Sequence, residues 1–259
     1  MSPVIHAAGF AAAGLSTWTY EAIECAEADL PGLVAGLGPE WAGLSLTMPL
    51  KEVALTVAAA ASPVATAIGA ANTLVRRPDG TWFADNTDVP GMVRVLREAG
   101  LAEKPSVTVL GGGGTARAAL AAAAELGSTE VTVVTRRPEA RAELAPAATA
   151  LDLTLIGVEW AEAPSAFDAD AVISTVPKGA ADGLAGAVRW RPGAVLFDAI
   201  YDPWPTPLAA AAAARGARVV SGLDLLLAQA LGQFEQFTGV FPAPEPAMRA
   251  ALDAAAGVR

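Results

Sequence analysis

Apolar residues along the chain follow two spacings, an alternation typical of strands and a period of three to four typical of helices. Both spacings occur in the first half, which therefore predicts strands and helices in turn. The predicted helices cover residues 3–14, 27–38 and 50–61, and the predicted strands cover residues 16–24, 41–47 and 67–77. This order of elements indicates the α/β class.

The second half repeats the alternation after an amphipathic helix over residues 87–101. The sequence EKPS, residues 103–106, interrupts the pattern and predicts a domain boundary near residue 100. Strands are predicted over residues 106–111, 130–135, 151–158, 169–175, 193–200 and 217–222, and helices over residues 114–127, 137–145, 206–216, 223–239 and 244–257. We therefore expect two α/β domains.

A run of glycines separates the strand over 106–111 from the helix that follows it. Gly111, Gly113, Gly114 and Arg117 give the spacing G-x-G-G-x-x-R, a relative of the dinucleotide-binding fingerprint. Glycines let the backbone approach a pyrophosphate, whose charge meets the free N–H groups at a helix N-terminus. A structural turn is the alternative, since tight turns also use glycine.

The next strand ends in Thr135, Arg136 and Arg137. NAD-binding folds usually carry an acidic residue here, which binds the ribose 2′-hydroxyl. An arginine can instead stack on adenine and bind a 2′-phosphate with its planar fork. The sequence therefore favours NADP as the cofactor, with a solvated basic turn as the alternative.

Charge and composition exclude several classes of partner. The formal net charge of −10 opposes binding to nucleic acid or to an anionic membrane surface. No apolar stretch of about 20 residues and no secretory signal pattern are apparent. The chain has one cysteine and one histidine, so we expect no metal centre and a reducing, cytoplasmic environment.

Short polar clusters interrupt the apolar first half at the predicted ends of strands and starts of helices. They contain Ser2; Thr47 with Lys51; Asn72 with Thr73; and Asn86, Thr87 and Asp88. Each has a structural alternative, such as Asp88 or Thr87 capping the following helix. Together they provide neutral hydrogen-bonding groups, a cation and a carboxylate, which suit a small polyhydroxy acid. Hydride transfer also needs a group that exchanges the hydroxyl proton, and Lys51 and Asp88 are the candidates.

Lys51 is notable for its rarity and its predicted place. The other lysines are Lys104 and Lys178, and arginine supplies the remaining basic side chains. The pattern places Lys51 at the start of a helix, where the helix dipole favours anions rather than cations.

Motifs over almost the whole chain resemble those of the shikimate dehydrogenases, in the same order and with similar spacing. They are SLTMPLK, GAANT, DNTDVPG, GGGGTARA, TRR, ISTVPKG, FDAIYDPWPTPL and GLDLLLAQALGQFEQFTG. The resemblance implies an N-terminal α/β substrate domain and a Rossmann-like NADP domain, with C-terminal helices that return to the first domain. The implied domains are residues 1–99 with 223–259, and residues 100–222.

The resemblance also implies NADPH-dependent, reversible reduction of 3-dehydroshikimate to shikimate by a monomer or homodimer. Lys51 matches the catalytic lysine, and Asp88 matches its acidic partner. Positions matching substrate-binding residues are Ser2, Thr47, Asn72, Asp88, Tyr201 and Gln229. Positions matching cofactor-binding residues are Gly111, Gly112, Gly113, Gly114, Thr115, Thr135, Arg136, Arg137, Ala199 and Gly222.

The chain departs from the family pattern in three places. The family's N-R-T segment is T-R-R here, which should strengthen binding of the 2′-phosphate, and Leu225 replaces a common methionine. Family members also have a strand and a first serine ahead of the position of Ser2. We expect that the start codon is assigned too late, because every later site is intact. The alternative is a truncated homologue with unpaired strand edges in the first domain.

Two other functions remain open at this stage. A quinate dehydrogenase of the same family would resemble this chain, although such enzymes tend to prefer NAD. A non-catalytic NADP-binding homologue is the other alternative. The absent first strand supports the non-catalytic reading, whereas Lys51 and Asp88 oppose it.

Overall fold

The computed structural model describes residues 1–257 and divides the chain into two compact units. Unit 1 is Met1–Gly91 with Leu226–Arg259, and unit 2 is Met92–Leu225. The divisions fall inside two helices, α5 (Asp88–Glu98) and α10 (Gly222–Thr238), which therefore contribute to both units. The sequence-based boundaries lie just after α5 and one residue into α10.

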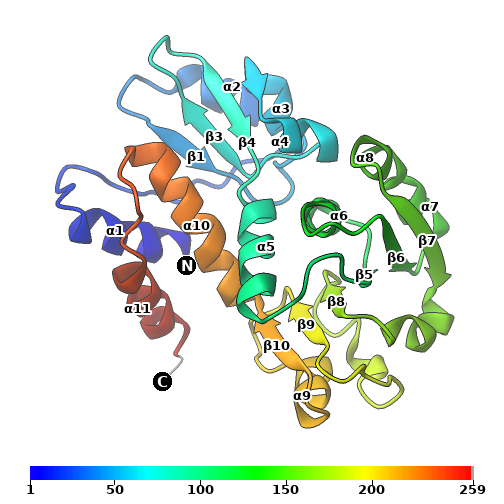
Figure 1. Ribbon diagram of the computed structural model, residues 1–259. Helices are drawn as coiled ribbons and strands as arrows, with labels where there is room; N and C mark the ends of the chain where they lie inside the picture. The colour runs from blue at the N-terminus through cyan, green and yellow to red at the C-terminus, as the bar shows by residue number, and fades with distance from the viewer. Residues whose placement is uncertain (258–259) are drawn as a thin grey trace. The chain divides into compact units, whose positions relative to one another are not determined.

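Unit 1 contains a small mixed sheet with the strand order β1-β3-β4-β2 (Figure 1). Strand β3 pairs antiparallel with both β1 and β4, and β2 pairs parallel with β4. The strands are β1 (Gly43–Ser45), β2 (Ala60–Ala61), β3 (Thr73–Arg76) and β4 (Trp82–Asp85).

The helices that lie wholly in unit 1 are α1 (Ser2–Ala12), α2 (Leu30–Gly36), α3 (Ala54–Val57), α4 (Pro63–Ile68) and α11 (Glu245–Ala256). Helix α1 packs against α11, and Gly9 brings it close to α10. A Cβ atom at Gly9 would lie 2.9 Å from the Phe234 ring, so a larger residue would push the helices apart.

The structure of unit 1 differs from the prediction in three places. Residues 16–24 form no strand, because the backbone of residues 19–25 makes no backbone hydrogen bond within the described chain. The helix predicted over 50–61 is reduced to α3, since Ala60–Ala61 pair with β4 instead. Strand β4 itself was not predicted, although Trp82–Asp85 alternate between buried and half-buried positions.

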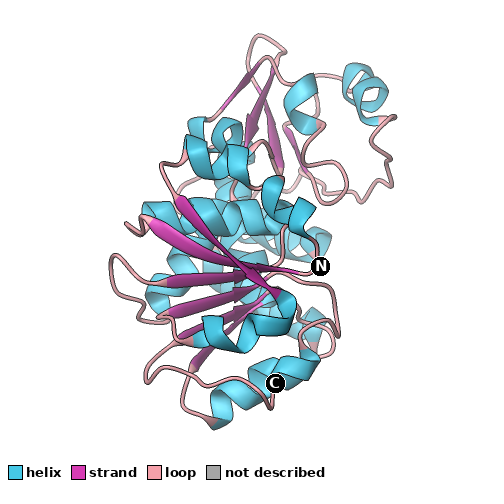
Figure 2. Cartoon of the chain, turned by 90° about the vertical axis from the view of Figure 1, so that its right-hand side faces the viewer, coloured by secondary structure: helices cyan, strands magenta, loops and turns pink. Residues whose placement is uncertain are grey.

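Unit 2 contains a parallel sheet of six strands in the order β10-β9-β8-β5-β6-β7 (Figure 2). Counted along unit 2, this order is that of the doubly wound dinucleotide-binding fold. The strands are β5 (Val107–Leu110), β6 (Glu130–Thr135), β7 (Thr154–Glu159), β8 (Ala171–Ser174), β9 (Val195–Asp198) and β10 (Arg218–Ser221). All six strands were predicted from the sequence.

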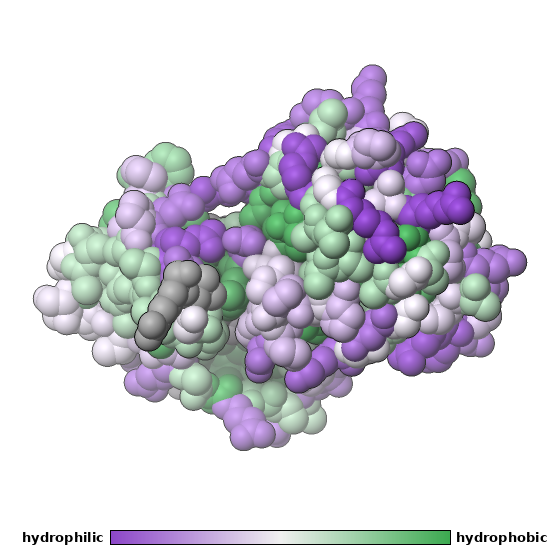
Figure 3. Space-filling view, turned by 90° about the horizontal axis from the view of Figure 1, so that it is seen from below, coloured by the Kyte–Doolittle hydropathy of each residue, from purple (hydrophilic) through white to green (hydrophobic). Residues whose placement is uncertain are grey.

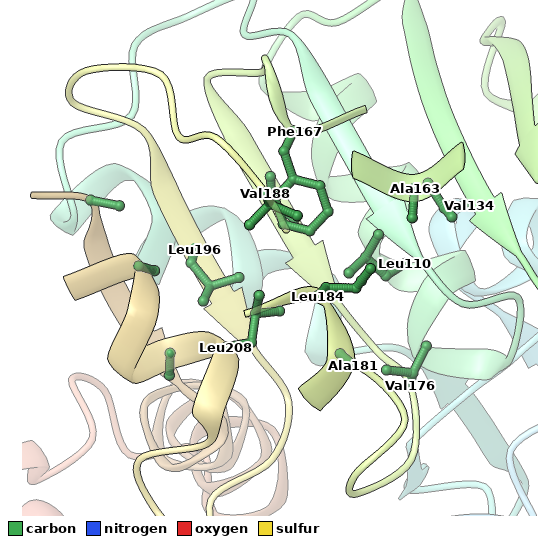
Figure 4. Close-up of a cluster of buried hydrophobic side chains, with 14 residues drawn as sticks. Leu110, Val134, Ala163, Phe167, Val176, Ala181, Leu184, Val188, Leu196 and Leu208 are labelled. Carbon is green, nitrogen blue, oxygen red and sulfur yellow. The ribbon is translucent and has the colours of Figure 1, made fainter. Parts of the chain in front are cut away.

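The helices of unit 2 are α6 (Gly114–Glu125), α7 (Pro138–Ala142), α8 (Ala145–Ala150) and α9 (Pro207–Ala214), with 3₁₀ turns η1 (Trp160–Phe167) and η2 (Asp182–Leu184). The helix predicted over 137–145 is divided, and α8 and the 3₁₀ turns were not predicted. Figure 4 shows part of the core, where Phe167 and Val188 pack near Leu196 of β9. Strands β5, β8 and β9 are buried throughout, as in parallel sheets covered on both faces.

The surface is mixed in character. On the face shown in Figure 3, hydrophilic and apolar residues are interspersed. Among residues 1–257, no helix is both long and apolar enough to cross a membrane.

His6 gives a testable pH dependence of stability. It is fully buried in α1 and stacks on Tyr20, with ring centroids 4.4 Å apart. Burial lowers the pKa of His6 to about 4. Above the unfolded-state pKa of about 6.5, His6 is neutral in both states and the stabilisation is fully present. As the pH falls from there toward 4, the unfolded chain binds a proton that folded His6 does not, so the free energy of unfolding falls by on the order of 3 kcal/mol.

We predict that His6→Phe, which cannot titrate, flattens this part of the pH profile. Urea unfolding of both proteins between pH 7.5 and about pH 4 measures the difference, and carboxylates common to both cancel in the comparison. Parallel pH profiles for the two proteins would contradict the prediction.

Candidate active site

Lys51 and Asp88 form a close ion pair in unit 1. The Nζ atom of Lys51 lies 2.6 Å from Oδ2 of Asp88, and the two side chains are 14% and 10% exposed. Lys51 carries three N–H donors, of which Asp88 takes one. Oδ1 of Asp88 has no hydrogen bond within residues 1–257. The pair therefore keeps donors and an acceptor for a ligand.

The backbone on both sides holds this pair in place. Lys51 precedes α3 in a turn rather than opening a helix, so the expected conflict with a helix dipole is absent. Its carbonyl accepts a hydrogen bond from Ala71 N at 2.7 Å, which ties the turn to the segment before β3. Asp88 opens α5, where a negative charge is favourable, and its N–H donates to Asn86 Oδ1 at 3.1 Å. The side chain that accepts from this first N–H of α5 is thus that of Asn86, not of Asp88 or Thr87.

A buried hydrogen-bond network, centred on the Asn72 side chain, adjoins the pair. Asn72 Oδ1 accepts from Thr87 N at 2.8 Å and from Thr73 Oγ1 at 2.7 Å. Asn72 Nδ2 donates to Thr87 Oγ1 at 3.0 Å and to Gln229 Oε1 at 3.4 Å. The network therefore unites two of the predicted substrate-binding residues, Asn72 and Gln229, with the residue before Asp88.

Gln233 extends the network and was missed from the sequence. Its amide donates to Asn72 O and to Thr73 Oγ1, both at 3.1 Å, and accepts from Ser45 Oγ at 2.8 Å. Gln233 follows Gln229 by four residues, so both lie on one face of α10. That spacing was the signal available in the sequence.

Ser2, the first residue of α1, lies near Tyr20, as does Ser45 of the network. Burial raises the pKa of Tyr20. Thr47 is placed differently, since it is exposed and only its carbonyl is engaged, by Leu50 N at 2.8 Å. Of the predicted substrate-binding residues in unit 1, Asn72 and Gln229 are thus linked by a hydrogen bond, whereas Ser2 and Thr47 lie outside that network.

The glycine loop of unit 2 fits a dinucleotide phosphate group. Gly111 has φ +112°, and a Cβ atom there would lie 2.5 Å from Thr175 Oγ1, so only glycine is accommodated. Gly113 and Gly114 have open space where a Cβ would be, and no side chain caps α6 at Gly113. The first N–H groups of α6, which include that of Thr115, are therefore available to an anion.

The basic residues after β6 are placed for a charged group. Thr135 is buried at the end of β6, while Arg136 and Arg137 are exposed and make no ion pair or hydrogen bond within the described residues. A Cβ on Gly112 would lie 2.9 Å from Ala140 of α7, so the glycine loop packs closely against the helix that follows these arginines.

A third group of predicted residues surrounds the end of β9. A Cβ on Gly222 would overlap Ala199 O and would lie 3.1 Å from Tyr201 Cδ1, so these residues meet closely. Asp198 accepts from Thr206 Oγ1 at 2.7 Å and from Ile200 N at 3.2 Å, which holds the intervening loop. Burial raises the pKa of Asp198. Tyr201, predicted to bind substrate, is 40% exposed and belongs to unit 2, unlike the other substrate positions.

Within residues 1–257, no cluster of three or more His, Cys, Asp or Glu side chains could hold a metal ion. The polar groups described above are amides, hydroxyls, an ammonium group and a carboxylate in unit 1, and the glycine loop in unit 2. A parallel sheet that leads through such a loop into a helix defines unit 2 as a dinucleotide-binding fold.

Comparison with known proteins identifies the family. Residues 1–74 match the shikimate dehydrogenase substrate-binding domain, and residues 222–252 match the shikimate 5'-dehydrogenase C-terminal domain. Residues 106–200 match the model described as NADP oxidoreductase coenzyme F420-dependent. A curated relative from Anaeromyxobacter dehalogenans, named shikimate dehydrogenase (NADP(+)), is 40% identical, with 100% of this chain and 93% of the relative covered. The chain belongs to the shikimate dehydrogenase family.

Solved structures agree with this assignment. Shikimate dehydrogenase of Mycobacterium tuberculosis is 48% identical, with a TM-score of 0.89 over 98% of this chain and 94% of that one. A Thermus thermophilus enzyme, solved in complex with NADP(H) and shikimate, is 32% identical, with a TM-score of 0.81 over 96% and 94%. The α/β architecture predicted from the sequence is therefore confirmed.

The buried network gives a prediction about stability. Gln233→Leu keeps the bulk of a side chain that is 1% exposed but removes its hydrogen bonds, which leaves the Ser45 hydroxyl and other buried polar atoms short of partners. We expect a loss of about 1–3 kcal/mol in the free energy of unfolding. Urea denaturation of the purified variant measures it.

Gln236→Leu is the matched control. Gln236 also lies on α10 but is half-buried and donates only to Asp85 Oδ2. We expect a loss of about 1 kcal/mol or less, since water can replace it. Equal losses in the two variants would contradict the special role of the buried network.

Proposed function

We propose that the chain catalyses the reversible, NADPH-dependent reduction of 3-dehydroshikimate to shikimate, a step toward the aromatic amino acids. The observation that carries the proposal is the largely buried Lys51–Asp88 pair with its spare donors and acceptor. Family membership supports the same activity, since the curated relative is named a shikimate dehydrogenase (NADP(+)).

Lys51 acts on the oxygen that changes charge. When bound, NADPH would supply the hydride for reduction of the C3 carbonyl of the substrate. Lys51 donates a proton to that oxygen, which becomes the C3 hydroxyl, and takes it back in the oxidative direction. Before it gives up this proton, the positive charge of Lys51 stabilises the negative charge that develops on the oxygen.

Asp88 orients Lys51 and binds substrate. Its Oδ2 holds the ammonium group at 2.6 Å, which limits the positions that the flexible lysine can adopt. We assign its Oδ1 to a hydroxyl next to the reacting carbon. A carboxylate held at the N-terminus of α5 requires little reorganisation during the reaction.

We assign the remaining polar residues to the substrate and the cofactor. Ser2 and Asn72 would bind the carboxylate and hydroxyls of shikimate, as the family resemblance implies. The other proposed substrate contacts are Thr47, Gln229 and Tyr201. The proposed NADP contacts are Gly111, Gly112, Gly113, Gly114, Thr115, Thr135, Arg136, Arg137, Ala199 and Gly222.

The remaining features of the biological setting are proposals from the sequence. We propose that unit 1 is the substrate domain and unit 2 the NADP domain. We further propose a cytoplasmic enzyme that acts as a monomer or homodimer, without nucleic acid or membrane partners. The negative net charge of −10 supports the exclusion of polyanionic partners.

Replacing Lys51 tests the catalytic assignment. We predict that Lys51→Gln lowers kcat by about 10²–10⁴-fold with a much smaller effect on KM for shikimate, because general acid and charge stabilisation are lost in the transition state. Asp88→Asn should lower kcat and also raise KM, because it loosens Lys51 and alters a substrate contact. Steady-state assays with 3-dehydroshikimate and NADPH measure both.

Lys104→Gln is the matched control, since Lys104 is exposed and lies in unit 2. It should keep wild-type kinetics. The role of Lys51 is wrong if Lys51→Gln retains most of its kcat.

Arg136 and Arg137 test the cofactor assignment. We predict that the double variant Arg136→Ala/Arg137→Ala raises KM for NADPH by about 10- to 100-fold, because charge-assisted hydrogen bonds to the 2′-phosphate are lost. KM for NADH should change by less than about threefold, since NADH lacks that phosphate. The exposed Arg189→Ala in unit 2 is the control with unchanged constants.

The same assay, run on the wild-type protein with shikimate and quinate and with NADP and NAD, separates this function from its rivals. A higher kcat/KM for quinate with NAD would assign the chain to quinate oxidation. Binding of NADPH without turnover of any of these substrates would make it a non-catalytic homologue.

A further inference from the structure

Lys178 is a cation that the proposed mechanism does not use. It is exposed and makes no ion pair or hydrogen bond within residues 1–257. Of the other two lysines, Lys51 is paired with Asp88, and Lys104 lies ahead of β5. The place of Lys178 in unit 2 therefore decides what its charge can do.

Strand β8, which leads to Lys178, lies at the point where the strand order of the sheet reverses. From β5 the chain runs outward through β6 and β7, and it then returns to the other side of β5 with β8, followed by β9 and β10. In open α/β sheets, ligands bind at such a point, outside the carboxyl ends of the strands. The loops that follow β5 and β8 are therefore the two that are placed to meet a dinucleotide.

The loop after β8 lies against the glycine loop after β5. The two strands end level with each other, since Leu110 pairs with Ser174. Thr175 donates to Leu110 O through its N–H, at 2.9 Å, and through its hydroxyl, at 2.8 Å. A Cβ atom on Gly111 would lie 2.5 Å from Thr175 Oγ1. Lys178 thus follows, by three residues, a side chain that lies directly beside the glycine loop.

A tight turn over residues 177–180 presents Lys178. The hydrogen bond that closes it, from the last N–H to the first carbonyl, measures 3.0 Å. Gly179 has φ +80°, as a type II turn requires at its third position, so Lys178 occupies the first corner. Val176 and Ala181, on either side of the turn, are buried in the apolar cluster shown in Figure 4. The backbone of Lys178 is thus fixed, while its ammonium group has no partner within the described residues.

The glycine loop itself offers a pyrophosphate no charged group. It provides the N–H groups at the start of α6, and the net charge of −10 opposes the approach of an anion. Arg136 and Arg137 follow β6 and are assigned to the 2′-phosphate, and Arg117 of α6 already interacts within the chain. Lys178 can supply the missing charge from the loop after β8.

We propose that Lys178 binds the pyrophosphate of the dinucleotide, together with the N–H groups of α6. This inference rests on the proposed function, because it takes NADPH as the ligand of unit 2. It divides the phosphates of the cofactor between two sets of cations. Arg136 and Arg137 distinguish NADPH from NADH, whereas Lys178 binds a group that both cofactors contain. Lys178 therefore strengthens the binding of either cofactor and does not select between them.

Fluorescence titration of the full chain with NADPH and with NADH measures both dissociation constants without turnover. We expect Lys178→Gln to raise Kd for both cofactors by the same factor, about 10-fold, because a charge-assisted contact to the pyrophosphate is lost. Lys178→Arg keeps the charge and should restore most of the affinity for both.

Fragments of the cofactor separate the two anionic groups. ADP carries a diphosphate but no 2′-phosphate, and adenosine 2′-monophosphate carries only the 2′-phosphate. In competition with NADPH, Lys178→Gln should bind ADP more weakly and adenosine 2′-monophosphate as the wild-type protein does. The variant Arg136→Ala/Arg137→Ala should show the opposite pattern.

Lys104→Gln is the matched control. Lys104 is also an exposed lysine of unit 2, but it precedes β5 and so lies at the amino end of that strand. Removing its charge should leave the dissociation constants of both cofactors and both fragments unchanged.

Equal binding of both cofactors by the wild-type protein and Lys178→Gln would overturn this inference alone. A loss confined to NADPH would also overturn it, because Lys178 would then belong to the 2′-phosphate. An equal loss in Lys104→Gln would reduce the effect to overall charge and contradict a specific contact. If the wild-type protein binds neither cofactor, the proposed function fails together with this inference.

Discussion

The side-chain amide of Asn72 lies where three segments of unit 1 meet: the start of β3, the loop ahead of α5, and α10. Its oxygen and nitrogen both bind Thr87, through the backbone at 2.8 Å and the hydroxyl at 3.0 Å. An unpaired polar group at this depth would cost about 1–3 kcal/mol, so the loop is held where the amide is satisfied. Asp88 is the next residue, and its carboxylate in turn fixes Lys51.

Stability alone does not explain the ion pair that depends on this network. Removing two charges from water costs much of the free energy that their attraction returns, so a buried pair contributes little net stability. The surrounding hydrogen bonds hold the pair in one geometry with donors and an acceptor unused. Such a preorganised arrangement suits a reaction in which charge appears on a substrate oxygen. The network therefore agrees with the catalytic role proposed for the pair.

The sequence predicted those features that depend on unusual residues or on local periodicity. Lys51 stands out because lysine is rare here, and strands β5 and β6 of unit 2 are rich in β-branched residues, which favour strands. Features that depend on a distant partner were missed. Residues 58–61 are alanines with good helix propensity, yet Ala60 and Ala61 form a strand because β2 pairs with β4. Gln233 gave little signal alone, since its role depends on Ser45 and Asn72, which are remote in sequence.

The net charge of −10 explains why the cations of the two proposed sites are held so differently. A negatively charged protein repels an anionic substrate and an anionic cofactor, so binding requires local positive charge. In the proposed mechanism Lys51 meets one atom of the substrate, and the ion pair with Asp88 restricts its flexible ammonium group. Arg136 and Arg137 have no ion pair within residues 1–257, and each retains its full charge for a ligand. A phosphate that accepts hydrogen bonds from several directions needs charge more than a fixed geometry, which the exposed guanidinium groups provide without a partner.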